Sequence, residues 1–278
     1  MKKWLTLLLV LGIVFLSGCD GAGGSGGSPS VSINNFGPLT IGTSGNPVRN
    51  GRLVTLSAIF KNEGGAPVEG GSAKIVGLGN DWIFEGGNRE ISFNIRPGQE
   101  VRRIWKITAP ETSEFEMDIT YPVEVRYEFP YGTVFRGTFS WLSSGSYDEL
   151  LNTAEQAYIE ETLKNKGFTV STTSKGPVSI DLQELEVIGN PEVLIKFNNR
   201  GGGRLVGSSI DIESVRGLNC PDLGGSIELI NNAYETYCTV NTGTDDDVSV
   251  DIEIRISYDY YVSDKSNIYY HDTGRTRT

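Results

Sequence analysis

Histidine, cysteine and methionine are scarce in this chain of 278 residues, which contains one His, three Cys and two Met. The single histidine, His271, lies near the carboxyl end, where a nucleophile and an orienting acid are not expected to be held around it. We expect His271 to be an exposed residue of the tail. Together with Cys220 and Cys238 it falls short of the ligand set of a zinc site. We therefore predict no catalytic residue, no metal site and no cofactor, and expect that the protein is not an enzyme.

Basic residues are also in deficit. The chain has 24 Lys and Arg against 35 Asp and Glu, so its formal net charge is -11. A surface with this excess of acid repels phosphate backbones and anionic lipid headgroups. Nucleic acid is therefore not expected as a partner.

No apolar run in the sequence reaches the roughly 20 residues that a helix needs to cross a bilayer. The amino-terminal run, residues 4–16, follows Lys2 and Lys3 and leads into the small residues Ser17 and Gly18. A basic segment, a short apolar segment and small residues are typical of a secretory signal. We expect residues 1–18 to be a signal peptide; an uncleaved signal anchor is the alternative, but the run is short for it.

The signal ends in Leu16-Ser17-Gly18-Cys19, which resembles the lipobox of prokaryotic lipoproteins. The resemblance implies cleavage before Cys19 and a thioether-linked diacylglycerol on its sulfur. Residues 19–30 are rich in Gly and Ser and are typical of a flexible tether. We therefore expect a protein held by membrane lipid through Cys19 on the extracytoplasmic face of the cell membrane.

The other two cysteines, Cys220 and Cys238, lie in the part expected to be exported. An oxidising compartment favours a disulfide between them, which would stabilise the fold by about 3 kcal/mol in the chain-entropy model. A metal site is the competing interpretation, but it lacks ligands. We predict the disulfide.

Two sets of strands are separated by one helical segment. Short alternating runs with glycine-rich turns predict an antiparallel β-sandwich over residues 31–143 and a second over 168–275. Within the first, Pro130-Tyr131-Gly132 is a turn signal that predicts a hairpin between strands at 121–129 and 133–141. In the second, strands are predicted at 178–187, 192–198, 207–215, 226–230, 234–240, 248–261 and 267–270.

The segment 146–167 has helical periodicity. Ser146 and Glu149 form a capping box, Gly167 is suited to the carboxyl-terminal cap, and apolar residues fall near one face. We predict one connector helix. Its apolar face packs either on its own chain or on a partner. The face comprises Leu150, Leu151, Ala154, Tyr158 and Ile159.

The two sandwiches share sequence features that indicate a duplication. The segments 58–65 and 195–202 both place an apolar strand end before Asn-x-Gly-Gly. The segments 122–129 and 252–260 are similar closing strands with Glu-x-Arg in the middle. Two matches in the same order favour an internal repeat.

These strand ends, together with 96–99 (Arg-Pro-Gly-Gln) before a Val/Trp strand, resemble the CARDB-type immunoglobulin-like modules of prokaryotic surface proteins. The resemblance implies a mainly β protein of two immunoglobulin-like antiparallel β-sandwiches, with adhesion or assembly roles and no chemistry of its own. We expect a non-catalytic binding or adhesion module for an extracytoplasmic protein or glycan. The alternative is a structural subunit of a cell-envelope or surface assembly.

Two further features leave alternatives open. The run Asp245-Asp246-Asp247 offers oxygen ligands for calcium, but without the spacing of a known calcium loop, and acidic loops are usually just solvated. Five tyrosines near the carboxyl end either pack at the edge of the sandwich or form an outward surface that contacts a partner. They are Tyr258, Tyr260, Tyr261, Tyr269 and Tyr270.

Overall fold

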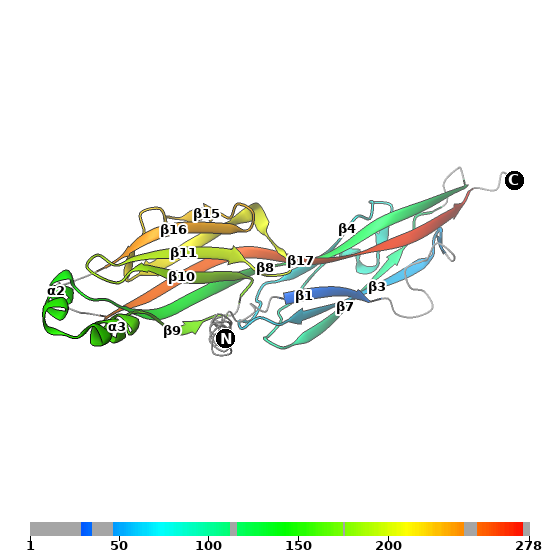
Figure 1. Cartoon of the computed structure of the whole chain (residues 1–278). Helices are drawn as coiled ribbons and strands as arrows, with labels where there is room; N and C mark the ends of the chain where they lie inside the picture. The colour runs from blue at the N-terminus through cyan, green and yellow to red at the C-terminus, as the bar shows by residue number, and fades with distance from the viewer. Residues whose placement is uncertain (1–28, 35–46, 112–115, 175, 242–248, 275–278) are drawn as a thin grey trace, which may run out of the picture.

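The computed structural model describes residues 29–34, 47–111, 116–174, 176–241 and 249–274, and these form an elongated, mainly β molecule with two lobes (Figure 1). Two helices lie at one end of the molecule, and the last strand ends at the other (Figure 1). Within the described ranges, no helix combines the length and the apolar content needed to cross a bilayer.

A ribbon of two very long strands joins the lobes. β8 (Glu116–Ser140) and β17 (Ser249–Thr273) are 25 residues each and pair antiparallel over their whole length. Alternate residues are apolar and buried over most of both strands, because successive side chains of a strand point to opposite faces. One continuous core therefore follows the inner face of the ribbon through both lobes.

The amino-terminal lobe stacks a four-stranded sheet on one half of this ribbon. Phe60 of this sheet packs against Tyr127 of β8, with ring centroids 5.2 Å apart. The sheet order is β1 (Pro29–Asn34), β3 (Leu53–Asn62), β7 (Glu100–Thr108) and β5 (Ile83–Phe84), followed in the chain by η1 (Glu85–Gly87). The ribbon is widened here by β4 (Ser72–Val76), β6 (Glu90–Ser92) and β2 (Val48–Arg49).

The carboxyl-terminal lobe repeats this arrangement on the other half of the ribbon. Its four-stranded sheet has the order β10 (Val178–Glu186), β11 (Glu192–Asn199), β16 (Ala233–Val240) and β14 (Leu218–Asn219). The ribbon is widened by β9 (Gly167–Thr173), β12 (Arg204–Leu205), β13 (Ser209–Arg216) and β15 (Ser226–Glu228), with η2 (Val206–Ser208) before β13.

Seven strands correspond in chain order and in sheet neighbours. The strands β1, β3, β4, β5, β6, β7 and β8 match β10, β11, β13, β14, β15, β16 and β17. The predicted Asn-x-Gly-Gly match is confirmed in detail. Asn62 accepts from the Gly64 N–H and donates to the Ala66 carbonyl, as Asn199 does with Gly201 and Gly203. The internal repeat is therefore a property of the structure.

The final strand of each repeat continues into the other lobe. β8 pairs with β4 through residues 124–128 and with β9 through residues 135–140. β17 pairs with β13 through residues 211–216 of that strand, and its far end pairs with β2. The two repeats follow one another along the chain, but the far end of β17 lies in the amino-terminal lobe.

The predicted hairpin at residues 130–132 is wrong. These residues lie within the unbroken β8, where Pro130 is exposed opposite Asp259 and Tyr131 is buried opposite Tyr258. The two strands predicted at 248–261 and 267–270 are likewise one strand, β17. We call this middle of the ribbon, around the pair Tyr131 and Tyr258, the waist.

The single predicted helix is two helices, α2 (Ser144–Thr153) and α3 (Gln156–Lys164). The chain is extended at Ala154 and Glu155, which breaks the helical repeat. Ser143, not Ser146, caps α2, because its Oγ accepts a hydrogen bond from the Ser146 N–H. The predicted apolar face is divided between the two helices: Ile159 is buried, whereas Leu151 and Tyr158 are exposed.

Candidate binding groove

The outer face of the ribbon next to the waist carries a network of charges. The Arg126 guanidinium lies 3.2 Å from Glu124 and 3.7 Å from Glu128, and Lys74 lies 2.8 Å from Glu128. The Arg126 guanidinium also stacks 4.6 Å above the ring of Tyr261. Strand alternation places these side chains outward, because their neighbours fill the core. The network fixes Arg126 in one orientation.

Lys265, from the facing strand, is held more loosely. Its Nζ lies 4.0 Å from Glu124, and its side chain is 78% exposed. An exposed ion pair at this distance contributes little to stability. The ammonium group of Lys265 is therefore open to a ligand.

A short strand, β12, forms the wall of the groove at the waist. Arg204 pairs with Tyr261 of β17, and the Gly203 N–H donates to the Tyr260 hydroxyl at 2.8 Å. A Cβ at Gly203 would lie 2.1 Å from the carbonyl oxygen of Tyr261, so only glycine permits this close approach. The approach places the exposed Arg204 beside the outer face of the ribbon.

These elements line an open hollow of about 340 Å³. A second hollow of about 330 Å³ lies next to it, and the two share Glu124 and Lys265 in their linings. We call the two together the waist groove. The first is lined by Glu124, Arg126, Gly202, Gly203, Arg204, Tyr261, Ser263 and Lys265. The second adds Val76, Gly77, Pro122, Val123, Ser266 and Asn267.

The other repeat contains the same ionic scaffold in a closed form. Glu253, the counterpart of Glu124, lies 2.7 Å from both Arg255 and Arg136. Hydrogen bonds from these two guanidinium groups lower the pKa of Glu253 to about 2. By the correspondence of the repeats, Arg136 is the counterpart of Lys265.

Three polar residues of the main hollow have no polar counterparts. Where the groove has Arg204, Tyr261 and Ser263, the other repeat has Pro67, Gly132 and Val134. The other repeat therefore retains the ion pairs, whereas Arg204, Tyr261 and Ser263 belong to one copy alone. Sequence reasoning missed Arg126, Arg204 and Lys265. The third glycine of the run 201–203, where the first repeat has Ala66, was the available signal.

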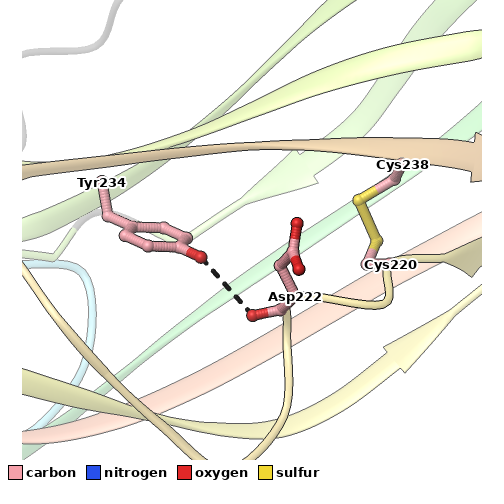
Figure 2. The surroundings of a disulfide bond; sticks show 4 residues. All are labelled: Cys220, Asp222, Tyr234 and Cys238. Atoms are coloured by element: carbon pink, nitrogen blue, oxygen red, sulfur yellow. Dashed lines mark hydrogen bonds between the residues drawn. A yellow bond between two sulfur atoms is a disulfide. The ribbon is translucent and has the colours of Figure 1, made fainter.

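Cys220 and Cys238 form a disulfide, as predicted (Figure 2). It joins the segment after β14 to β16, with the two Cα atoms 4.4 Å apart. Near it, the Tyr234 hydroxyl donates to the Asp222 carbonyl at 3.4 Å (Figure 2). The disulfide fixes this loop in the carboxyl-terminal lobe. In the ranges that the structure describes, no three His, Cys, Asp or Glu side chains come together as possible metal ligands.

His271 is not part of an exposed tail, so that prediction is wrong. It lies in β17 opposite Asp118, whose carboxylate is 2.9 Å from Nδ1, and Glu116 is 3.9 Å from Nε2. Pairing with β8 extends the ordered strand to Thr273. The imidazole is placed between two exposed carboxylates at the far end of the molecule, away from the waist groove.

The tyrosine cluster divides between the two interpretations. Tyr258, Tyr260 and Tyr270 are buried and belong to the core. Tyr261 faces the waist groove, and Tyr269 is half-buried. The lipidation residue Cys19 and the acidic run 245–247 lie outside the described residues.

No protein-family model matches the chain, and no curated protein matches it significantly. Among solved structures, it is similar to the secreted serine protease VesC from Vibrio cholerae, with 12% sequence identity and a TM-score of 0.21. The match covers 86% of this chain and 50% of that chain, so this chain spans half the length of that one. A similarity of this size carries no argument about fold or activity.

Proposed function

We propose that this protein is a non-catalytic binding module, tethered by lipid on Cys19 to the extracytoplasmic face of the cell membrane, whose ligand occupies the waist groove. The groove carries this proposal. It combines charged, hydroxyl and aromatic side chains from β8, β12 and β17 in one hollow. Binding sites are concave and place a few polar groups to orient the ligand.

The proposed fold is a tandem of immunoglobulin-like sandwiches of the CARDB type. The closing strand of each sandwich continues into the other one, and we call this arrangement the strand exchange. The seven matching strands of each repeat, in stacked antiparallel sheets, support this fold. Such sandwiches bind ligands through their sheet faces and loops, and the same fold serves many functions. The function is therefore argued from the groove.

The position of β1 bears on how the module would stand on a membrane. Pro29, its first residue, pairs with Asn62, whose loop contacts Tyr131 at the waist through the Ala66 N–H. Residues 19–28 span at most about 35 Å when fully extended. The lipid would therefore hold the molecule through β1, with Pro29 within that distance of the bilayer.

A structural subunit of an envelope assembly is the second candidate, and the edge strand β9 favours it. Its residues 169–173 are exposed and carry neither charge nor proline. An exposed strand edge of this kind is a template for pairing with another chain. Leu151 and Tyr158 on the helices are exposed at the same lobe.

The tether is tested by the intact mass of the protein extracted from membranes of the producing cell. We expect cleavage before Cys19 and the added mass of a diacylglycerol, and we expect Cys19→Ser to release the protein from the membrane fraction. Recovery of unprocessed protein in the cytosol would contradict the tether.

The binding role is tested by capture of extracytoplasmic components with the purified exported chain. Arg204→Gln should weaken capture, whereas removal of residues 144–166 should leave it unchanged. Loss of capture only on removal of the helices would reject the groove and favour the assembly role.

A further inference from the structure

The waist groove points to a ligand class, and we infer that it binds an acidic glycan through the carboxylates of its uronic acid residues. This inference rests on the proposed function and deepens it. It follows from the charge of the groove, from the chemistry of its lining, and from the comparison of the two repeats.

The groove is a cationic site on an acidic protein. Arg126, Arg204 and Lys265 line the main hollow against the single carboxylate of Glu124, whereas the chain as a whole has a formal charge of -11. The nearby pair of Lys74 and Glu128 is neutral in sum. A local excess of positive charge in such a field concentrates anions.

Two of the three cations are available to a ligand. Among the residues that the structure describes, Arg204 takes part in no ion pair, and Lys265 reaches Glu124 only at 4.0 Å. A guanidinium group binds a carboxylate through two parallel hydrogen bonds. Arg126 is engaged with the two glutamates and with Tyr261, so it orients the site and leaves the capture of the anion to Arg204 and Lys265.

The lining fits a sugar. The floor of the groove is the outer face of a sheet, where β8 and β17 pair with each other, with β4 beside β8 and β12 beside Tyr260 and Tyr261 of β17. The side chains of Ser263, Ser266, Asn267 and Glu124 offer donors and acceptors suited to hydroxyl groups.

Glu124 also discriminates between anions. Its side chain is 18% exposed and lies within the groove, so it accepts hydrogen bonds from sugar hydroxyls and repels a doubly charged phosphate more than a singly charged carboxylate. A uronate supplies both the single charge and the neighbouring hydroxyl groups.

The other repeat provides an internal control. Its closed ion pairs around Glu253 retain the scaffold, but Pro67, Gly132 and Val134 replace the groups that would contact a sugar. Ionic stability alone therefore does not require Arg204, Tyr261 or Ser263. These three residues are the additions that make one copy a binding site.

The test is calorimetric titration of the purified exported chain with trigalacturonate and with its uncharged methyl ester. We expect trigalacturonate to bind and the ester to bind at least tenfold more weakly, with affinity falling as salt is raised. Arg204→Gln and Lys265→Gln should each weaken binding about tenfold. Arg136→Gln, the matched change in the other repeat, should leave it unchanged.

Several outcomes would overturn the inference. Equal affinity for the acid and its ester, or loss of affinity with Arg136→Gln, would remove the carboxylate site. Binding of hexaglutamate or of a polyphosphate with higher affinity than trigalacturonate would assign the groove to another ligand class, and no binding of trigalacturonate would reject the glycan. In these cases, capture that still depends on Arg204 would leave the proposed function standing.

Discussion

Tyr131 on β8 and Tyr260 on β17 occupy equivalent positions, and each hydroxyl accepts a hydrogen bond from the main-chain N–H four residues after the asparagine that ends β3 or β11. The bonds are 3.1 Å from Ala66 and 2.8 Å from Gly203. Both tyrosines are buried at the waist. They fasten the Asn-x-Gly-Gly loop of each repeat to the long ribbon.

Replacing Tyr260 with Phe should lower the free energy of unfolding by about 1–3 kcal/mol, because the partly buried N–H of Gly203 loses its acceptor. Urea denaturation of the purified chain measures the change. Tyr131→Phe should act in the same direction through Ala66. Tyr269→Phe, on the half-buried outer position, is the control and should change stability by less than about 0.5 kcal/mol.

Gly203→Ala should damage both stability and the groove, whereas Gly202→Ala should not. A Cβ at Gly203 would meet the Tyr261 carbonyl oxygen at 2.1 Å, and a Cβ at Gly202 meets no atom within 4 Å. We expect Gly203→Ala to separate β12 from β17, lowering both the thermal midpoint and ligand affinity. Thermal unfolding and ligand titration of both variants measure these two effects. The same thermal midpoint and the same affinity in Gly203→Ala and Gly202→Ala would contradict the close approach of Gly203 to β17.

Glu253 should make the fold sensitive to acid. Its pKa is lowered to about 2 by Arg255 and Arg136, so its ionised form stabilises the folded state above the ordinary carboxyl pKa of 4.5. That contribution is lost as the pH falls from about 4.5 towards 2. Glu253→Gln should therefore flatten the dependence of unfolding free energy on pH in this window. Denaturation at a series of pH values measures this dependence. The same dependence in Glu253→Gln and in the parent would show that Glu253 is not the group responsible.

The disulfide between Cys220 and Cys238 closes a separation of 18 residues, and its loss should lower the free energy of unfolding by about 3 kcal/mol. The double variant Cys220→Ser/Cys238→Ser, compared with the parent by denaturation, measures the effect. Thiol titration of the unreduced Cys19→Ser chain should find no free thiol. Two reactive thiols would show that the bond does not form.

Much of the local structure is visible in the sequence. The strand Glu192–Asn199 was predicted at 192–198, and the end of its counterpart Leu53–Asn62 was predicted from the segment 58–65, because both apolar runs end in a glycine turn. The match of Asn62 with Asn199 was also predicted, because the motif reflects local hydrogen bonds that short sequence segments specify.

The partners of the long strands could not be predicted in this way. Alternation tells which face of a strand is buried, but not which strand lies beside it or where that neighbour ends. At Pro130 a local turn signal competes with pairing along the whole ribbon, and the pairing prevails. The tail assignment of His271 was wrong for the same reason, since this part of β17 is a strand through its pairing with β8 and β2, which the local sequence does not show.

The groove could not be predicted because its residues meet only where β17 continues past β12 and pairs with β8 in the amino-terminal lobe. Arg126, Arg204 and Lys265 come from β8, β12 and β17, which are far apart in the sequence. In the sequence, the Glu-x-Arg pattern indicates only that the closing strands are similar. The break between α2 and α3 also had no signal, because Ala154 and Glu155 are good helix formers.

The exchange of β8 and β17 predicts that the two repeats fold only together. An exported chain cut between Ala154 and Glu155, in the extended link between the helices, gives fragments 19–154 and 155–278. Each fragment alone exposes the inner face of the half of its long strand that belongs in the other lobe, so neither should unfold cooperatively. Mixed or co-expressed, they should form a one-to-one complex through the 25-residue ribbon, detected by size-exclusion chromatography and light scattering. Folding of either fragment as a stable monomer without affinity for the other would refute the exchange.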